Sequence, residues 1–473
     1  MFNNAQIIIF FIHLIGVLAA LDAIMKGRTS QGSIAWVISL VIFPYLALPL
    51  YWIFGSRRFH GYVNARRAGD LQINKISHKL KKRLEELEFI QKDNFPTYHA
   101  LQKLARIPIT DYNQAKLLVN GDATFDAIFK GIDNAKKYII IQFYKITYDG
   151  IGKKLKKHLI KQAKNGIKVY FLYDDIGCHK LPKSYFKELR HSGVQVSTFK
   201  TFKWFSTKMR LNFRNHRKIV VIDGIKAFVG GFNVSDKYLG IDPKFGFWRD
   251  THVQINGPSV QCIQLPFISD WFWATKKVPK LDWEPKSAEG GNTKVLTLPT
   301  GPDDEMETCG LFFVQAINSA KKRLWLVSPY FVPDEQVLTA LQLAGLRGVD
   351  VRLIIPEKSD LKITYYSSFS YLKEITKAGV KVYRYTKGFL HQKVMLIDDN
   401  TTMIGTANLD NRSFRINFEI NMLFFNKEFA KIVEDMIKKD LADSYRTDYL
   451  EYKDKPLWFK LIVRISRLLA PLQ

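Results

Sequence analysis

The feature that most constrains the fold of this chain is an eight-residue box that occurs twice. The polar positions of its two copies are His216, Lys218 and Asp223, and then His391, Lys393 and Asp398. Four apolar residues separate each lysine from its aspartate, which predicts a short buried strand with the histidine and the lysine on the same face. Each copy is therefore expected to present an imidazole beside an ammonium group at a strand end.

The repetition extends well beyond the box. The two histidines are 175 positions apart (391 minus 216), and the same offset relates Asn233 to Asn408 (408 minus 233). Upstream, Gly166 corresponds to Gly348 at an offset that drifts to 182 (348 minus 166). Such drift is typical of a duplication in which loops change length while the core elements are kept. The chain is therefore predicted to contain a duplicated domain.

Strand-like and helix-like segments alternate from about residue 117 onward. In the first repeat, the apolar run at 138–144 precedes an amphipathic segment at 150–163, and the second repeat follows a similar order. This alternation is typical of layered α/β domains. We expect one domain at residues 111–284 and its duplicate at residues 292–450, with Pro285 among the residues that break regular structure between them.

Two long apolar runs precede the repeats, at residues 7–25 and 34–54. Since about 20 apolar residues cross a bilayer as a helix, both runs are long enough to span it. The first lacks the basic start and the small-residue cleavage site of a signal peptide. Pro44 and Pro49 predict a kink in the second. Residues 1–56 are therefore expected to form a two-helix transmembrane hairpin.

The charge of the chain indicates an anionic partner. It contains 71 Lys and Arg against 44 Asp and Glu, a net charge of +27 that suits either nucleic acid or acidic lipid. Basic residues are frequent in the segment 57–110, which we expect to be a juxtamembrane linker. By the positive-inside rule, they place the globular part in the cytoplasm, with Met1 on the same side of a multi-pass protein.

The C-terminal residues 456–473 can be drawn as an amphipathic helix, with a basic face opposite an aromatic and aliphatic face. This pattern is typical of a helix that lies in a membrane interface, although an ordinary packing helix would also fit it. The three cysteines, Cys178, Cys262 and Cys309, show no spacing typical of a metal or redox motif. We expect no metal site and no cofactor.

Paired His-x-Lys-x-x-x-x-Asp boxes, each followed by small residues and an asparagine, resemble those of the phospholipase D superfamily. The flanking segments 212–218, 328–334, 405–414 and 417–419 are most similar to those of bacterial cardiolipin synthases. This resemblance covers nearly the whole chain. It implies two phospholipase D-like α/β/α sandwich domains packed as a pseudo-twofold pair.

Such boxes can cleave a phosphodiester without a metal. The reaction needs a nucleophile, a proton donor for the leaving alkoxide, and positive charge where negative charge accumulates. One imidazole would form a phosphohistidine while the other exchanges protons with the alcohols, and by resemblance the nucleophile is His216. The groups expected to clamp the phosphate oxygens are Lys218, Lys393, Asn233 and Asn408. Asp223 and Asp398 belong to the boxes, yet their place at strand ends also suits a role in holding the box loops.

The resemblance assigns further roles. Asp250 and Glu419 are expected to orient the two histidines. The implied reaction converts two phosphatidylglycerol molecules into cardiolipin and glycerol at the inner membrane of a bacterium. Its partners are phosphatidylglycerol and anionic membrane lipid, and no nucleic acid is expected. A membrane-bound phosphodiesterase of the same fold, which would release phosphatidic acid, is the alternative.

Residues near the boxes are candidates for binding the second substrate molecule. Arginine forms a fork that matches phosphate geometry, so the flanking arginines are candidate ligands of a second phosphate. They are Arg214, Arg217, Arg412 and Arg415. An aromatic set suits either an acyl channel or core packing. It comprises Tyr330, Phe331, Tyr365, Tyr366, Phe369 and Tyr371.

Overall fold

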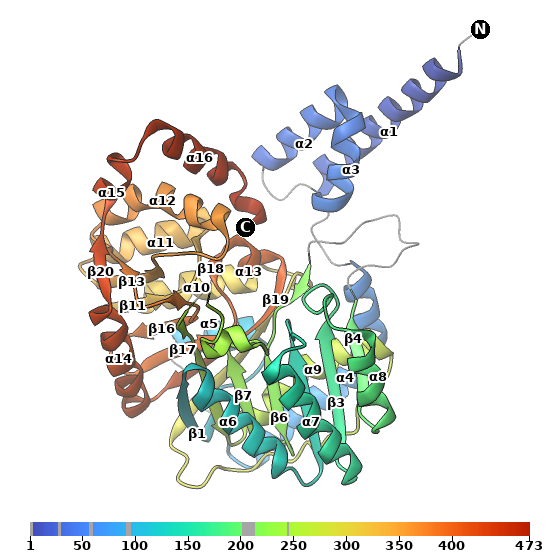
Figure 1. Cartoon of the computed structure of the whole chain (residues 1–473), viewed down its shortest axis with the longest axis vertical. Coiled ribbons are helices and arrows are strands. Elements are labelled where there is room, and N and C mark those ends of the chain that lie inside the picture. Colours follow the sequence, from blue (N-terminus) through green and yellow to red (C-terminus); the bar gives the residue numbers. More distant parts are fainter. Residues whose placement is uncertain (1–2, 27–29, 56–59, 91–95, 201–212, 244–245) are drawn as a thin grey trace.

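The computed structural model of the chain describes residues 3–473 except 27–29, 56–59, 91–95, 201–212 and 244–245. Three N-terminal helices stand apart from a large α/β body, which we define as the described residues from 60 onward (Figure 1). The body is built on a 16-stranded sheet whose strand order is nearly symmetric about its middle.

Each repeat contributes corresponding strands in the same spatial order. From the middle outward, the first half contains β1 (Thr110–Val119), β9 (Thr251–Asn256), β7 (Lys226–Gly230), β6 (Ile219–Ile222), β2 (Tyr138–Phe143), β3 (Lys168–Asp174) and β4 (Gln195–Phe199). The second half contains β10 (Thr293–Thr300), β19 (Asn417–Phe425), β17 (Thr401–Gly405), β16 (Val394–Ile397), β11 (Arg323–Val327), β13 (Asp350–Pro356), β14 (Lys381–Tyr385) and β20 (Ser444–Thr447). Antiparallel pairing of β1 with β10 joins the two halves. The predicted duplicated α/β fold is confirmed.

Helices cover both faces of each half-sheet. The first half carries α6 (Asn120–Asp133), α7 (Gly150–Lys164), α8 (Lys183–His191) and α9 (Ser259–Thr275), and the second carries α10 (Thr308–Ser319), α11 (Glu335–Leu346), α12 (Lys362–Lys377), α13 (Asn411–Arg415) and α14 (Lys427–Ala442). Alternate residues of the box strand β6 enter different cores: Val220 packs with residues of α6, α7 and α8, whereas Val221 enters a central core shared by both halves. Strands buried on both faces read as continuous apolar runs, which explains the apolar centre of each box.

The segment expected to be a linker is largely helical. It contains α4 (His60–Glu86) and α5 (Pro96–Ala105). Leu80 and Leu84 of α4, together with Leu101 of α5, are buried in the core that also contains residues of α10 and α11. Parts of this segment are therefore packed against the second repeat, and Arg57 and Arg58, two of the basic residues expected in the linker, lie outside the described residues.

The N-terminal helices are α1 (Asn4–Lys26), α2 (Ser30–Ile42) and α3 (Pro44–Phe54). The second expected span is not one kinked helix, because the chain leaves the helical conformation at Phe43 (φ −127°, ψ 57°). Proline disfavours the helical region for the residue before it, so the break falls just before Pro44, whereas Pro49 is accommodated inside α3. Of the described helices, α1 is the one long and apolar enough to cross a membrane.

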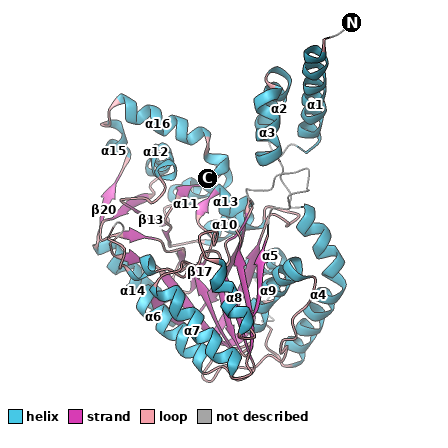
Figure 2. Cartoon of the chain, turned by 45° about the vertical axis from the view of Figure 1, so that its right-hand side comes forward, coloured by secondary structure: helices cyan, strands magenta, loops and turns pink. Residues whose placement is uncertain are grey.

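At the other end of the chain, α15 (Tyr449–Lys453) and α16 (Leu457–Leu468) lie over the second half (Figure 2). Phe459 and Val463 of α16 are buried in the same core as Phe369 and Tyr371 of α12. One side of the expected C-terminal helix is therefore packed against the second half. Some of the aromatic residues considered for an acyl channel belong to the core that this side contacts. Phe331, Phe369 and Tyr371 are core residues.

Candidate active site

The two box histidines are each paired with a carboxylate from the opposite repeat. His216 Nδ1 lies 2.9 Å from both carboxylate oxygens of Glu419. His391 Nδ1 lies 2.7 Å from Asp250 Oδ2. A carboxylate that accepts the Nδ1 proton leaves Nε2 as the nitrogen available for chemistry. Each repeat thus contributes one imidazole to the site and orients the imidazole of the other.

The backbone before each box also docks on the opposite half. β5 (Arg214–Asn215) pairs with the start of β19, and His216 N donates to Phe418 O at 2.9 Å. In the second copy, β15 (Phe389–Leu390) pairs with β8 (Trp248–Arg249), and His391 N donates to Arg249 O at 2.8 Å. These reciprocal pairings place the two boxes at the interface between the repeats.

The box lysines take equivalent positions. Lys218 Nζ donates to His216 O at 2.7 Å, and Lys393 Nζ donates to His391 O. Both lysines are buried. The prediction that a strand end presents an ammonium group beside an imidazole is therefore confirmed in both repeats.

Two of the four flanking arginines are structural. Arg217 is buried, with Nη1 2.8 Å from Asp270 Oδ2 and Nε donating to Glu419 O at 3.1 Å. Arg415 donates to Glu307 at 2.9 Å and to Asp334 at 3.0 Å. Because these carboxylates already neutralise both guanidinium groups, Arg217 and Arg415 are not suited to bind a second phosphate. Burial raises the pKa of Tyr144, and the nearby charges of Arg214 and Arg412 oppose this shift, which places both guanidinium groups near the Tyr144 hydroxyl.

A second buried network secures the other box. Arg249 forms a bidentate pair with Asp440, at 2.6 and 3.0 Å, and Gln392 Nε2 donates to the same carboxylate at 2.7 Å. Arg249 lies in the first repeat and Asp440 in the second, so this ion pair also crosses the interface. Gln392 occupies the same position in the second box as Arg217 does in the first, and each of the two side chains donates to a buried aspartate.

The two asparagines at equal offset occupy equivalent loops but have different partners. Asn233 Nδ2 donates to Tyr238 OH at 2.8 Å. Asn408 Nδ2 lies 3.1 Å from Asp410 Oδ2, and its Oδ1 is buried with no partner among the described residues. Their amides are held in place beside the boxes.

Asp223 and Asp398 lie at the far ends of β6 and β16, away from the histidines. Asp223 accepts the backbone N–H groups of Lys136, Lys137 and Tyr138 at 2.8, 2.7 and 2.9 Å. Asp398 accepts those of residues 321–323 in the same manner. These contacts favour the second of the two expected roles, in which Asp223 and Asp398 hold the turns that follow the box strands.

Burial perturbs the protonation of the first box. It lowers the pKa of His216 to about 4, against the opposing effect of Glu419, and lowers the pKa of Lys218 to about 7. Although burial opposes it, the adjacent His216 and Lys218 hold the pKa of Glu419 below its usual value. The first pair is therefore a neutral imidazole on an ionised carboxylate.

The second box has a different balance. Burial raises the pKa of Asp250 to about 6 and lowers that of Lys393 to about 8. Burial, with the charges of Lys393 and Lys218, also lowers the pKa of His391. The Asp250 carboxylate thus holds a proton more readily than Glu419 does. Two carboxylates with pKa values pushed apart indicate different roles in acid–base chemistry.

Aromatic rings that the sequence analysis missed flank both histidines. The ring of Tyr144 is 5.2 Å from that of His216, and the ring of Trp248 is 5.1 Å from that of His391. Lys237 lies 4.6 Å from the Trp248 ring, and its number differs by 175 from that of Arg412 (412 minus 237). That offset was a signal in the sequence for cations placed equivalently beside the two boxes.

The carboxylate of Glu419 has its own supports, which were also missed. Ser413 Oγ donates to Glu419 Oε1 at 3.0 Å, and Asn417 Nδ2 donates to the same oxygen at 3.1 Å.

Among the described residues, no group of three or more His, Cys, Asp and Glu side chains is arranged to hold a metal ion.

A duplicated α/β fold that brings two His-x-Lys boxes together across its repeat interface defines an enzyme of the phospholipase D superfamily. A family model described as "Cardiolipin synthase, PLD-like domain" matches residues 128–244 and 313–441, one segment in each repeat. Cardiolipin synthase A of Pseudomonas putida is 46% identical over 464 residues, which cover 98% of this chain and 96% of that protein. The chain belongs to the bacterial cardiolipin synthase family.

Other comparisons agree with this assignment. Cardiolipin synthase A of Pseudomonas fluorescens (strain SBW25) is 46% identical over 477 residues, which cover 100% of this chain and 99% of that protein. The crystal structure of phosphatidylserine synthase from Haemophilus influenzae Rd KW20 covers 80% of this chain and 100% of its own, with a TM-score of 0.62 and 15% sequence identity. At 15% sequence identity, the similarity to phosphatidylserine synthase shows a shared fold only.

Proposed function

We propose that this enzyme makes cardiolipin by transferring a phosphatidyl group from one phosphatidylglycerol to another through a phosphohistidine. The observation that carries the proposal is the pair of imidazoles at the repeat interface, each oriented by a carboxylate of the opposite repeat. Relatives that share 46% of their residues over nearly the whole chain are named cardiolipin synthases, which favours transfer over hydrolysis.

In the first half-reaction, His216 Nε2 attacks phosphorus and the bond to the glycerol headgroup breaks. The leaving alkoxide takes a proton from His391, so that free glycerol departs and a phosphatidyl group remains on His216. In the second, His391 takes a proton from the terminal hydroxyl of another phosphatidylglycerol. The resulting alkoxide attacks phosphorus, His216 leaves, and cardiolipin is formed.

The unequal carboxylates support this assignment of roles. Glu419 remains ionised and accepts the Nδ1 proton of His216, which keeps the Nε2 lone pair free to attack. Asp250, with a pKa of about 6, keeps a proton to higher pH than Glu419 does, so its pair with His391 is the better proton donor of the two. A bound phosphodiester anion further favours the protonated imidazole of His391 because opposite charges stabilise each other.

The lysines supply positive charge for the phosphate oxygens and predict the alkaline limb of the pH profile. Burial lowers the pKa of Lys218 to about 7 and that of Lys393 to about 8, so both ammonium groups lose their protons as the pH rises through this range. We expect kcat/KM to fall above about pH 7–8, well below the ordinary lysine pKa of about 10.4. Initial rates at low substrate concentration across pH 5–10 measure this; an unchanged rate up to pH 10 would contradict it.

Because the lysines provide this charge, we expect a chelator such as EDTA to leave the rate of transfer unchanged. The measurement is the initial rate in detergent before and after chelation, followed by dialysis. A loss of activity that added divalent cation restores would refute a metal-free mechanism.

The second phosphatidylglycerol needs a site for its own phosphate, and we assign it to Arg214 and Arg412. Burial and the like charge of Arg214 lower the pKa of Arg412. The two guanidinium groups therefore lie close enough to repel each other. Both charges also act on Tyr144, which lies against His216. Two neighbouring guanidinium groups beside the nucleophile suit a phosphate anion.

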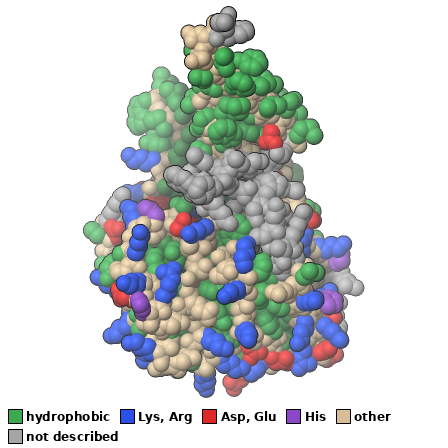
Figure 3. Space-filling view, turned by 90° about the vertical axis from the view of Figure 1, so that its right-hand side faces the viewer, with side chains coloured by type: hydrophobic (Ala, Val, Ile, Leu, Met, Phe, Trp, Pro, Cys, Tyr) green, Lys and Arg blue, Asp and Glu red, His purple; other side chains and the backbone are tan. Residues whose placement is uncertain are grey.

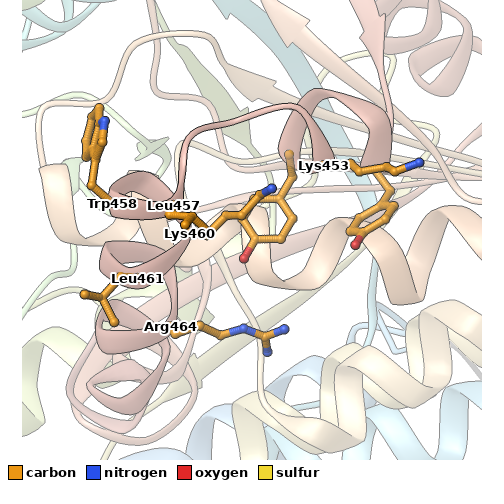
Figure 4. A pocket seen from close by; sticks show the side chains of 8 residues that line it. Lys453, Leu457, Trp458, Lys460, Leu461 and Arg464 are labelled. Carbon is orange, nitrogen blue, oxygen red and sulfur yellow. The ribbon is translucent and has the colours of Figure 1, made fainter.

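The surface of the protein fits a lipid substrate. On α16, the side chains of Leu457, Trp458, Leu461 and Leu468 are exposed. A cavity of 610 Å³ between α15 and α16 is lined by aromatic and basic residues, and Trp458 and Arg464 project from different sides of the helix (Figure 4). We infer that α16 lies in the interface of a bacterial inner membrane, with the body in the cytoplasm.

Incubation of the purified enzyme in detergent with headgroup- and acyl-labelled phosphatidylglycerol tests the proposed function. Cardiolipin and free glycerol in equal amounts are the expected products. Phosphatidic acid as the main product would instead establish the hydrolase, and the absence of turnover would reject both activities. Phosphatidylethanolamine offered as a second donor would define the range of headgroups.

A further inference from the structure

The break at Phe43 reverses the direction of the chain. The rings of Trp36 in α2 and Tyr51 in α3 lie 5.2 Å apart. In one continuous helix, these residues would be separated by about 22 Å, at 1.5 Å per residue. α2 and α3 therefore lie side by side as an antiparallel pair.

Contacts with α1 show how far this pair extends along that helix. Near the break, a Cβ added to Gly16 would lie 2.5 Å from Leu40 O, and Tyr45 OH lies 3.3 Å from His13 Nε2. At the end of α3, Tyr51 OH donates to Asp22 Oδ2 at 2.9 Å. The pair thus begins near the C-terminal end of α1, turns beside its middle, and returns to the same end.

The lengths of the helices agree with this geometry. α1 has 23 residues, whereas α2 has 13 and α3 has 11. At 1.5 Å per residue, α2 and α3 reach roughly 20 and 16 Å, well short of the roughly 30 Å hydrocarbon core that α1 can cross. Hydrophobic side chains cover this end of the molecule, whereas Lys and Arg are spread over the body (Figure 3).

The distribution of charge in the sequence independently favours one crossing. In the sequence, Lys26 and Arg28 lie at the junction of α1 and α2, and Arg57 and Arg58 follow α3. With two full crossings, Lys26 and Arg28 would face the side opposite Arg57 and Arg58. With one crossing, all four face the cytoplasm, as the positive-inside rule prefers.

We propose that α1 alone crosses the bilayer and that α2 and α3 form a re-entrant pair embedded in the leaflet next to the body. The N-terminal end of α1 then lies on the side opposite the active site, and the expected multi-pass arrangement is replaced by a single crossing. The exposed apolar side chains of the pair contact acyl chains of the same leaflet from which the active site draws its lipids. His13 and Tyr45 hydrogen-bond each other at the depth of the turn, which lessens the cost of polar groups there.

Single cysteines in the full-length protein distinguish the two arrangements. Asn3→Cys, Gln31→Cys and Glu289→Cys report on the residue before α1, the first turn of α2, and the body. Each is treated with a membrane-impermeant maleimide in intact spheroplasts and in inverted vesicles. The unsubstituted protein is the control, since its own cysteines, Cys178, Cys262 and Cys309, are buried.

We expect Gln31→Cys and Glu289→Cys to react in inverted vesicles and Asn3→Cys in spheroplasts. An N-terminal epitope tag should likewise be digested by protease added to spheroplasts. Reaction of Gln31→Cys from the side opposite Glu289→Cys, or of Asn3→Cys and the tag from the same side as Glu289→Cys, would overturn the proposal. Retained phosphatidyl transfer by each variant verifies folding, and the labelling pattern is independent of which lipid product forms.

Discussion

Replacing His216 with alanine is expected to lower the rate of phosphatidyl transfer by on the order of 10⁴-fold or more, because the group that we propose as the nucleophile is lost. His391→Ala removes the proposed proton donor instead, and the loss of such a group typically lowers the rate about 10²- to 10⁴-fold. The measurement is kcat with labelled phosphatidylglycerol in detergent. His191→Ala, at an exposed histidine away from both boxes, is the control and should retain full activity.

A substrate with a good leaving group separates the two roles. A phosphatidyl ester of p-nitrophenol needs no proton for its departure, so His391→Ala should still become labelled with the phosphatidyl group. His216→Ala should not. Labelling of His216→Ala, with none on His391→Ala, would exchange the two assignments. Full activity of either variant with the natural substrate would reject the two-histidine mechanism.

Glu419→Gln is expected to lower kcat by about 10²- to 10⁴-fold without unfolding the protein. The amide has the shape of the carboxylate and can still accept hydrogen bonds from Ser413 and Asn417. It binds the Nδ1 proton of His216 weakly, however, and favours the tautomer in which Nε2 carries the proton and cannot attack. Nitrogen NMR of labelled histidine reports the tautomer, and thermal unfolding verifies the fold.

Asp250→Asn provides a matched comparison in the other pair. If Asp250 acts through the proton donor His391, its substitution should slow release of glycerol but have little effect on release of p-nitrophenol. Glu419→Gln should be slow with both substrates, because it impairs the attacking nitrogen. Equal responses of the two variants to the leaving group would contradict the different roles. Glu428→Gln, at an exposed position, is the control.

The local elements and the duplication were predictable from the sequence. The apolar centre of each box became β6 or β16, because residues buried on both faces of a strand have to be apolar. The offset of 175 between Asn233 and Asn408 identified equivalent loops without coordinates. The role of Asp223 as a holder of backbone N–H groups was visible only as one of two interpretations.

Other features depend on contacts between distant residues. His216 and Glu419 are 203 positions apart, and His391 and Asp250 are 141 apart, so no local pattern reveals that the repeats exchange their carboxylates. In the sequence, Arg217 and Arg412 are equally suitable as candidate phosphate ligands. The buried Asp270 forms an ion pair with Arg217, whereas Arg412 lies within the influence of Arg214 as well as of Asp410 and Glu419.

The N-terminal segment shows the same division. Composition identified an apolar region that suits a membrane, because hydrophobicity is a property of the residues themselves. Pro44 predicted a break in the helix but not the angle between the two parts, because a proline only removes a hydrogen bond and restricts the residue before it. Packing of Tyr51 against Trp36 and Asp22 set the angle, and with it the number of crossings that we propose. Burial and partner choice arise from the whole fold, and they determine which of several chemically suitable side chains are engaged by carboxylates of the protein itself, as Arg217 is by Asp270.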